Sequence, residues 1–377
     1  MNKEDPLILP SKTIQRLLLS KELNSISYLK EINNENEIIY LDKNENPFPP
    51  PIRNFSSPKF IKSLNNYPDP NSTTFLNDLS QHLKIPTSFL LIGSGSDELI
   101  DLIIRTYSTP KSTVLSVNPT FSMYEFYTKI NGAKFESQLL KLKLNNATGI
   151  AQFDLDQNSF MQKAKFSNII ILARPNNPDG MLISLNFIKQ LLELKKLVII
   201  DEAYIDFSDK SSMVDLIKIY NNLIISRSFS KSYSLAGLRL GYIIANPSII
   251  NILNCIKSPY NVNRLASQFG SLVLNNQKEV SANIDKIKSI RDNFYKALIR
   301  LRKIHRKFYI HPSEANFILL RFQSPEISDS LHQHFLKYKI KVRRFKSELS
   351  NCLRISIGTS LQMKRVIEIL KLYFEVN

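Results

Sequence analysis

The residues with the clearest chemical potential lie in one stretch, residues 226–241. Lys231 follows two serines, Ser228 and Ser230. Arg239 comes eight positions after this lysine. Two hydroxyls and a guanidinium form an anion site, because serine donates single hydrogen bonds and arginine donates in a fork that fits phosphate. A lysine that is held near other positive charge and partly desolvated becomes a nucleophilic amine.

Three interpretations of this stretch are open at this point. A run of serine, lysine and arginine is usually a solvated loop. Residues 228–231 also match the Ser-x-x-Lys pattern of penicillin-recognising acyl enzymes, but the Ser-Asp-Asn and Lys-Thr-Gly motifs of those enzymes are absent from the chain. A phosphate site beside an activated amine fits a phosphorylated aldehyde that forms an imine, and pyridoxal phosphate is the obvious candidate.

A carboxylate and a phenol follow another apolar run. Asp201 comes directly after residues 197–200, and Tyr204 lies three positions further on. A buried carboxylate facing a pyridine nitrogen keeps that nitrogen protonated, so that the ring can accept the electrons of a broken Cα–H bond. Tyr204 can donate to the phenolic oxygen of the same ring. The alternative for Asp201 is an ordinary N-cap aspartate.

Three more side chains are candidates. Asn177, in the turn formed by residues 174–180, can offer its amide to the ring oxygen, and Phe121 can stack on the ring. Arg354 lies in an alternating strand, where an inward-facing arginine would need an anion such as a substrate carboxylate. The alternatives are a core phenylalanine and an outward-facing arginine.

A glycine-rich turn, residues 93–98, joins a short apolar strand to the start of a helix. Such a turn places backbone N–H groups and the positive helix end around an anion. It is not the dinucleotide fingerprint, because Glu98 stands where a third glycine would fall. A plain strand-to-helix turn is the alternative.

The elements that must position these residues alternate between strand and helix. The expected strands are continuously apolar, which is typical of a mostly parallel sheet buried on both faces. Ligands bind at the carboxyl ends of such strands, where Asn177, Asp201 and Lys231 fall. The strands are expected at residues 113–117, 133–140, 168–173, 196–200, 222–226 and 241–245.

The pattern of the chain changes twice. Residues 1–40 are polar with amphipathic patches and are expected to form an N-terminal arm. Residues 41–265 are expected to form a large cofactor-binding domain. A long helical stretch from residue 263 to about 302 then leads into a smaller α+β domain, residues 266–377, which closes with helical periodicity.

Composition excludes several classes of protein. No apolar run approaches the length of a membrane span, and the N-terminus has no signal-peptide core. The only two cysteines, Cys255 and Cys352, do not indicate a disulfide framework, so we expect a reduced, cytoplasmic protein. No metal site is predicted.

The formal net charge of +17 is unusual and could indicate a nucleic-acid partner. Its lysines are mostly dispersed, and no zinc-finger spacing, helix-turn-helix cue or RNA-binding signature accompanies them. We therefore prefer a coding bias towards lysine, asparagine and isoleucine, and expect no nucleic-acid partner.

Taken together, the motifs resemble the fold-type I pyridoxal-phosphate aminotransferases, and specifically the histidinol-phosphate aminotransferases. The resemblance runs from about Leu41 to Leu370. It rests on Asn44-Glu45-Asn46-Pro47, Tyr67-Pro68, Gly95-Ser96-Asp97-Glu98, Asn176-Asn177-Pro178, Asp201-Glu202-Ala203-Tyr204, Ser230-Lys231, Ala236-Gly237-Leu238-Arg239, Pro259-Tyr260-Asn261-Val262-Asn263 and Leu353-Arg354-Ile355.

The resemblance implies an α/β fold whose large domain has a mostly parallel seven-stranded sheet. It implies that Lys231 binds the cofactor pyridoxal 5'-phosphate and then moves a proton between the substrate Cα and C4′. Asp201 would pair with the ring nitrogen, and Phe121 would stack on the ring. Tyr204 and Asn177 would bond to the ring oxygen. The cofactor phosphate would be held by the backbone of Ser96 and Asp97 together with Ser228, Ser230 and Arg239.

The resemblance also implies a homodimer with shared active sites, in which Tyr67 reaches the phosphate of the neighbouring subunit's cofactor. Arg354 would hold the substrate's α-carboxylate or its equivalent carbon, and Arg343, with Tyr28 and Tyr260, would meet the substrate phosphate. Because the loop between Arg343 and Arg354 is short, Arg344 stays open as an alternative to Arg343.

Two positions depart from the family's pattern. Asp179 stands where a threonine is usual, which we expect to alter only a turn, and Phe121 replaces a common tyrosine but keeps the stacking surface. The implied reaction transfers an amino group between L-histidinol phosphate and 2-oxoglutarate in histidine biosynthesis. The alternatives are an aromatic-amino-acid aminotransferase, a threonine-phosphate decarboxylase, or, from another class, a basic nucleic-acid-binding protein with a decayed site.

Overall fold

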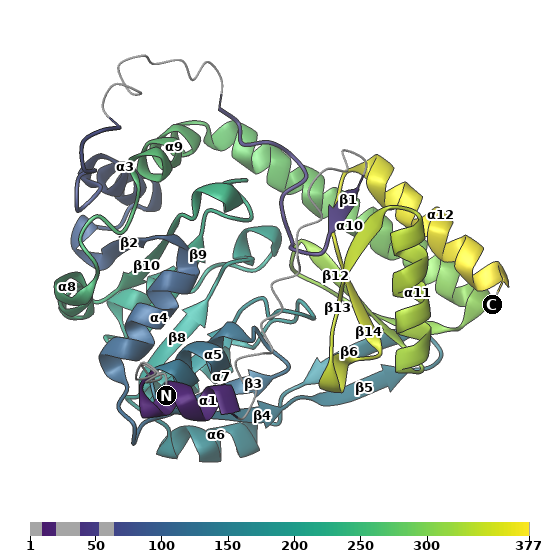
Figure 1. The fold of residues 1–377 in the computed structure, drawn as a ribbon, viewed down its shortest axis with the longest axis horizontal. Helices are drawn as coiled ribbons and strands as arrows, with labels where there is room; N and C mark the ends of the chain where they lie inside the picture. Colours follow the sequence, from purple (N-terminus) through teal and green to yellow (C-terminus); the bar gives the residue numbers. More distant parts are fainter. Residues whose placement is uncertain (1–9, 20–37, 53–63, 377) are drawn as a thin grey trace, which may run out of the picture.

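The structure is a computed structural model that describes residues 10–19, 38–52 and 64–376. Two seven-stranded sheets stand side by side within these residues, each covered by helices (Figure 1). The described helices include none that is both long enough and apolar enough to cross a membrane.

The first sheet has the strand order β2-β10-β9-β8-β7-β3-β4. Every described neighbour pair is parallel except the two pairs made by β10, which runs antiparallel to β2 and β9. The predicted mostly parallel seven-stranded sheet is therefore confirmed. The strands are β2 (Leu90–Gly93), β3 (Thr113–Asn118), β4 (Lys134–Leu139), β7 (Ile169–Ala173), β8 (Leu197–Asp201), β9 (Leu223–Ser228) and β10 (Gly241–Ala245).

Both faces of this sheet are buried, because alternate residues of each central strand enter different cores. In β7, Ile170 and Leu172 pack into one core, whereas Ile169 and Ile171 pack into the other. The first core is shared with α3 (Thr73–Leu83), α6 (Gln157–Phe166), α7 (Leu185–Glu193) and α9 (Arg264–Asn275). The second is shared with α4 (Gly95–Tyr107), α5 (Met123–Ile130) and α8 (Pro247–Ile256).

The second sheet has the order β1-β13-β14-β12-β11-β6-β5. It combines distant parts of the chain, as the mixed colours of its strands in Figure 1 show. Its strands are β1 (Ile39–Leu41), β5 (Lys141–Asn145), β6 (Ile150–Asp154), β11 (Phe308–His311), β12 (Phe317–Phe322), β13 (Ile340–Arg344) and β14 (Cys352–Ser356). Its helices are α10 (Gln277–His305), α11 (Pro325–Lys337) and α12 (Ser360–Val376).

The predicted division of the chain at residues 40 and 265 stays a prediction. Residues 39–41 and 150–154 nevertheless pair with strands that follow residue 307, and residues 141–145 join the same sheet by pairing with residues 150–154, which we did not expect. The long helical stretch expected from residue 263 is two helices, because the backbone leaves helical geometry at Asn276. The side chain of Asn276 bonds to the carbonyl of Leu272 in the last turn of α9.

The remaining described elements are short. Helix α1 (Lys12–Leu19) packs on α5 and is part of the predicted N-terminal arm. The 3-10 turns are η2 (Thr87–Phe89), η3 (Ile205–Phe207), η4 (Val214–Lys218), η5 (Ala236–Leu238) and η6 (Ser347–Leu349).

Candidate active site

The amine of Lys231 lies beyond the carboxyl end of β9. It donates a hydrogen bond to the carbonyl of Lys43 at 3.1 Å and lies 6.0 Å from the ring centre of Tyr204. No ion pair joins it to a carboxylate in the described part of the chain. Burial, reinforced by the charge of Arg354, lowers the pKa of Lys231 to about 8. A useful fraction of this amine is therefore neutral and nucleophilic near neutral pH.

Asp201 ends strand β8, with only 6% of its surface exposed. Its carboxylate accepts hydrogen bonds from the Tyr124 hydroxyl at 2.7 Å and from the backbone N–H of Ala203 at 3.0 Å. Burial raises the pKa of Asp201 to about 6 even though both hydrogen bonds favour the charged form. The carboxylate has no cationic partner among the described side chains, so a protonated ring nitrogen would fit it.

Lys231 and Asp201 share their charged neighbours. The carboxylate of Asp97 raises the pKa of both groups, and Arg354 lowers the pKa of Lys231 and of Tyr204. The amine and the carboxylate therefore have an electrostatic neighbour in common, which agrees with the predicted site. An ion pair between them would shift their pKa values apart, whereas burial moves each towards its neutral form.

Tyr204 is buried, and its hydroxyl accepts a hydrogen bond from Nδ2 of Asn44 at 3.1 Å. Burial raises the pKa of Tyr204, so the hydroxyl keeps its proton and can donate it. Asn177 accepts a hydrogen bond from Arg354 through its Oδ1, which leaves its Nδ2 group as a donor. Both side chains therefore keep the donor that the predicted ring oxygen requires.

Arg354 faces inward from β14, with 7% of its surface exposed. Besides Asn177 it donates to the carbonyl of Asp42 at 2.9 Å, and its Nε is buried without a partner in the described residues. Burial lowers the pKa of Arg354 to about 10. A buried guanidinium with an unused donor and no carboxylate partner fits a ligand anion.

The predicted phosphate site lies where β9 ends and α4 begins. Ser228 and Ser230 are buried, and the Ser228 hydroxyl accepts from the backbone N–H of Ser230 at 3.1 Å. Arg239 donates to the carboxylate of Asp97 at 2.8 Å, in the first turn of α4. Ser228 pairs with Gly241, which lies against the start of α4, so the helix N-terminus, a serine and a guanidinium come close together, which is the chemistry of a phosphate site.

Glycines allow this close approach. A Cβ at Gly95, whose φ is +84°, would lie 2.9 Å from Nη2 of Arg239. A Cβ at Gly241 would lie 2.6 Å from the backbone nitrogen of Ser96. Gly241 therefore lets strand β10 contact the backbone of α4, and Gly95 supplies a left-handed φ that side chains rarely adopt.

Phe121 follows β3 and is partly exposed. Its ring lies 5.5 Å from that of Tyr124 in an edge-to-face arrangement, and Tyr124 in turn holds Asp201. Phe121 is therefore attached to the site through Tyr124, with one part of its ring available for stacking.

The two adjacent arginines of β13 differ in their surroundings. Arg344 is exposed and pairs with Asp329. Arg343 lies opposite Arg354 in the strand register and 5.9 Å from the ring of Phe345, and its charge lowers the pKa of Arg354. In the described residues Arg343 has no acidic partner, so it is the freer of the two cations.

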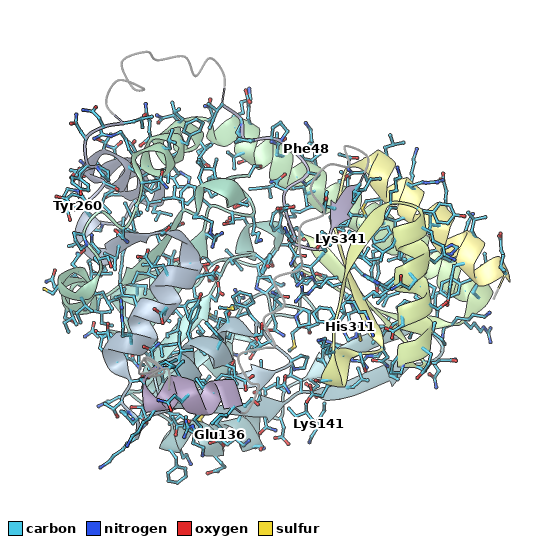
Figure 2. All side chains as sticks on the ribbon, in the orientation of Figure 1. Phe48, Glu136, Lys141, Tyr260, His311 and Lys341 are labelled. Atoms are coloured by element: carbon cyan, nitrogen blue, oxygen red, sulfur yellow. The ribbon has the colours of Figure 1, made fainter. Side chains whose placement is uncertain are left out.

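Tyr67 and Tyr260 lie away from these residues. Their rings stack at 4.7 Å with 78% and 42% of each residue exposed. Figure 2 shows Tyr260 at the outer edge of the first sheet's side, far from Lys341, which shares strand β13 with Arg343. Within one chain the predicted pair of Arg343 and Tyr260 is not brought together. Tyr28 lies outside the described residues.

Three functional residues were not predicted from the sequence. Tyr124 holds Asp201, Asn44 holds Tyr204, and Asn46 donates to the backbone carbonyl of Lys231 at 2.9 Å. Asn44 and Asn46 belong to one of the motifs behind the resemblance, but a motif assigns no partner to a side chain. Tyr124 follows Phe121 by three positions, about one helical turn, which is the signal that could have identified it.

Asp179 is more than a turn residue. It is 2% exposed, and its carboxylate accepts a hydrogen bond from Nδ2 of Asn176 at 2.7 Å. Burial raises the pKa of Asp179 to about 7. The expectation that this position alters only a turn is therefore incomplete, because a carboxyl group is buried here without a cation among the described residues.

These observations agree with pyridoxal phosphate as the ligand of the site. Among the described residues, Lys231 has no carboxylate partner, Asp201 lacks a cation and the Nε of Arg354 lacks an acceptor, while backbone N–H groups lie beside Arg239 at the start of α4. The cofactor's aldehyde fits Lys231, its ring nitrogen fits Asp201, and its phosphate fits the N–H groups beside Arg239. A substrate anion fits the Nε of Arg354.

Comparison with known proteins gives the same result. The family model for aminotransferase class I and II matches residues 36–370. Histidinol-phosphate aminotransferase of Christiangramia forsetii is 35% identical over 340 residues, which cover 89% of this chain and 89% of that protein.

Two solved structures have the same fold. The histidinol-phosphate aminotransferase of Clostridium acetobutylicum superposes with a TM-score of 0.76 at 27% identity, covering 90% of this chain and 100% of that one. That of Sinorhizobium meliloti, in complex with pyridoxal-5'-phosphate, gives a TM-score of 0.78 at 18% identity and covers 99% of both chains. The predicted fold-type I architecture is confirmed.

Replacing Asp179 tests its burial. In the folded protein the pKa of Asp179 is about 7, above the ordinary value of 3.8. The contribution of this carboxyl group to the stability of the fold is therefore fully present below pH 3.8 and is lost as the pH rises through about 7. Each pKa unit corresponds to roughly 1.4 kcal/mol. Asp179→Asn should therefore melt about 5 °C above wild type near pH ~9.

Near pH ~5 the gain should be much smaller, because the wild-type carboxyl is then protonated in the fold. Calorimetry of both proteins at the two pH values measures this difference. The exposed Asp215, replaced in the same way, serves as the control and should give no gain at either pH. An equal gain for Asp179→Asn at both pH values would contradict a buried titrating carboxyl.

Proposed function

The chain belongs to the aminotransferases of class I and II, and on that premise we propose that it is a histidinol-phosphate aminotransferase. It exchanges an amino group between L-histidinol phosphate and 2-oxoglutarate, a step of histidine biosynthesis, with pyridoxal phosphate as cofactor. The substrate assignment is supported most by Arg343, which has no acidic partner in the described residues and lies next to the buried Arg354. Together the two offer two cationic groups to an anion.

When bound, the cofactor supplies an aldehyde that takes up an amino group and a ring that accepts electrons. Lys231 would hold the cofactor through its aldehyde, and as a free amine it would take the proton from the substrate Cα. Its lowered pKa of about 8 suits this role, because a general base works best near the operating pH.

The other residues orient the reacting groups. Asp201 keeps a proton on the ring nitrogen, and Tyr204 and Asn177 donate to the ring oxygen. The backbone of Ser96 and Asp97, with Ser228, Ser230 and Arg239, binds the cofactor phosphate. Phe121 covers one face of the ring and limits its tilt.

The substrate anions are bound from β13 and β14. Arg354 would donate from its free Nε to the α-carboxylate of glutamate and would face the corresponding carbon of histidinol phosphate. Arg343 meets the phosphate in one half-reaction and the side-chain carboxylate of glutamate in the other. A guanidinium suits both tasks, because it donates in a planar fork to either anion.

We further propose that the enzyme is a homodimer in which each subunit completes the other's site. The stacked and exposed Tyr67 and Tyr260 support this, because two aromatic rings left in water on one chain fit a contact with another. Tyr67 would bond to the partner's cofactor phosphate, and Tyr260, with Tyr28, would join the partner's Arg343. A cytoplasmic location agrees with two free cysteines, Cys255 and Cys352.

The assignment is tested by comparing amino donors with the cofactor-loaded protein. Loss of Arg343 should remove a charge-assisted contact to phosphate, so Arg343→Gln should lower kcat/KM for histidinol phosphate at least about tenfold. Phenylalanine, which has no side-chain anion, should be used equally by both proteins. Arg344→Gln is the matched control and should keep the wild-type preference, because Arg344 is bound to Asp329.

Other outcomes would identify the alternatives. A wild-type preference for phenylalanine would indicate an aromatic-amino-acid aminotransferase. Release of carbon dioxide from threonine phosphate would indicate the decarboxylase, for which no transfer to 2-oxoglutarate is expected.

The shared site is tested by mixing two impaired subunits. Lys231→Ala removes the amine, and Tyr67→Ala removes the contact to the neighbouring cofactor. Co-expression should restore roughly a quarter of wild-type activity, because half of the dimers are mixed and each mixed dimer has one intact site. Size-exclusion chromatography must show dimers throughout. Dimers without recovery would mean that Tyr67 serves the site of its own chain.

A further inference from the structure

A buried arginine joins the chain segments that carry Asp201 and Lys231. Arg227, on β9, donates to Glu202 at 3.3 Å and to Asp206. Glu202 directly follows Asp201. The second oxygen of Asp206 accepts a hydrogen bond from the hydroxyl of Ser232, which directly follows Lys231. The guanidinium of Arg227 is thereby linked directly to Glu202, the neighbour of Asp201. Through Asp206 it is also linked to Ser232, the neighbour of Lys231.

The carboxylate of Glu202 is itself held firmly. Its side chain is fully buried and also accepts from the backbone N–H of Met213 at 2.8 Å and from the Ser212 hydroxyl. On the lysine side, Asn46 donates to the backbone carbonyls of Lys231 and Ser232 at 2.9 and 3.3 Å. The backbone on both sides of the site is therefore fixed by polar contacts to the groups around it.

We propose that Arg227 is a positioning residue for the amino transfer. The chain of contacts from Glu202 through Arg227 and Asp206 to Ser232 sets where Lys231 stands relative to Asp201. It does so without touching substrate or cofactor. The inference rests on one part of the proposed function, namely that Lys231 binds the cofactor. It does not depend on the identity of the substrate.

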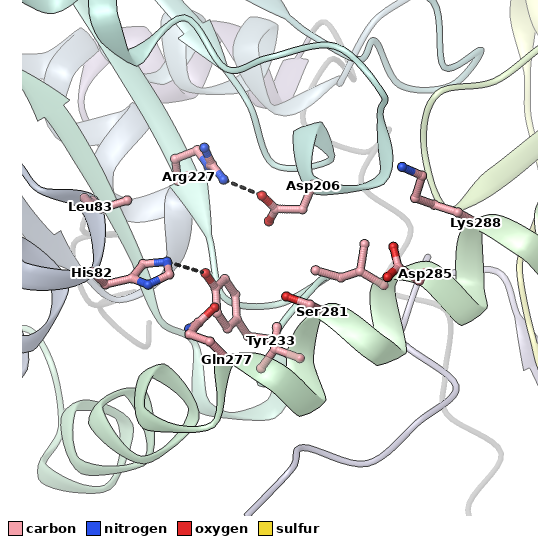
Figure 3. A pocket seen from close by; sticks show the side chains of 11 residues that line it. His82, Leu83, Asp206, Arg227, Tyr233, Gln277, Ser281, Asp285 and Lys288 are labelled. Atoms are coloured by element: carbon pink, nitrogen blue, oxygen red, sulfur yellow. Dashed lines mark hydrogen bonds and ion pairs between the residues drawn. The ribbon is translucent and has the colours of Figure 1, made fainter.

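A cavity of about 280 Å³ opens onto this network. Figure 3 shows Arg227 and Asp206 on one side of it, Tyr233 and His82 on another, and Ser281, Asp285 and Lys288 on helix α10. Its lining includes neither Lys231 nor Asp201. A small cation can thus reach the position of the Arg227 guanidinium through the cavity without entering the candidate active site.

The first test removes one contact of the network. Ser232→Ala deletes only the hydroxyl that bonds to Asp206, so the fold should persist while the lysine loop loosens. We expect kcat to fall about tenfold with little change in KM, because small displacements of a reacting group lower the rate steeply. The absorbance of the bound cofactor, titrated against pH, should move its midpoint to higher pH, because better solvation favours the protonated form of the nitrogen that joins Lys231 to the cofactor.

Ser234→Ala is the matched control in the same loop. The hydroxyl of Ser234 is buried and has no hydrogen-bond partner in the described residues, so its loss should change neither kcat nor the absorbance midpoint. If Ser232→Ala matches wild type in both measurements, the proposal is wrong. Because the absorbance is read without substrate, this result is separate from any failure of the substrate assignment.

The second test restores what a mutation removes. Arg227→Ala should lose at least about a hundredfold in kcat. Millimolar guanidinium chloride should then recover at least about tenfold of this loss by entering the cavity, whereas equal sodium chloride should not. Arg291→Ala removes another buried arginine, one that bonds to the carbonyl of Phe207 and does not line this cavity, and should show no recovery.

Equal recovery in both arginine variants, or none in Arg227→Ala, would overturn the proposal. Should Arg227→Ala fail to fold, the comparison of Ser232→Ala with Ser234→Ala decides alone.

Discussion

A half-buried amine, that of Lys231, and a buried carboxylate, that of Asp201, share the charged neighbour Asp97 without forming an ion pair with each other. Burial lowers the pKa of Lys231 to about 8 and raises that of Asp201 to about 6, the opposite of what mutual attraction would produce. Leaving such groups unpaired is unfavourable for the isolated chain. In the proposed function this cost would be offset by an aldehyde bound to the amine and a protonated ring nitrogen beside the carboxylate. The rest of the site is arranged to keep these two groups apart and in place.

The position of both groups could be predicted because it follows from local rules. Apolar runs without polar interruptions predict strands buried on both faces, and the ends of parallel strands gather ligands. Asp201 ends β8 and Lys231 follows β9, as these rules require. The sequence motifs also predicted roles for Tyr204, Asn177 and Arg354. The contacts of these side chains agree with the predicted roles, which stay predictions.

Features that depend on distant parts of the chain could not be predicted. Strands β5 and β6 join the second sheet, although the exposed, lysine-bearing β5 resembles a surface segment. The burial of Asp179 and the stacking of Tyr67 on Tyr260 depend on what packs against them. Arg227 lies among the serines of the first motif, yet only the fold connects it to Glu202 and Asp206. Such partners are set by tertiary packing, which residue spacing does not encode.

The central claim is that one particular amine binds the cofactor. Borohydride reduction of the pyridoxal-phosphate-loaded protein, followed by peptide mass mapping, tests it most directly. We predict a single phosphopyridoxyl group on Lys231, and no label at this peptide when Lys231 is replaced by alanine. A label on another lysine in the unmodified protein, or stable yellow colour in Lys231→Ala, would contradict the account.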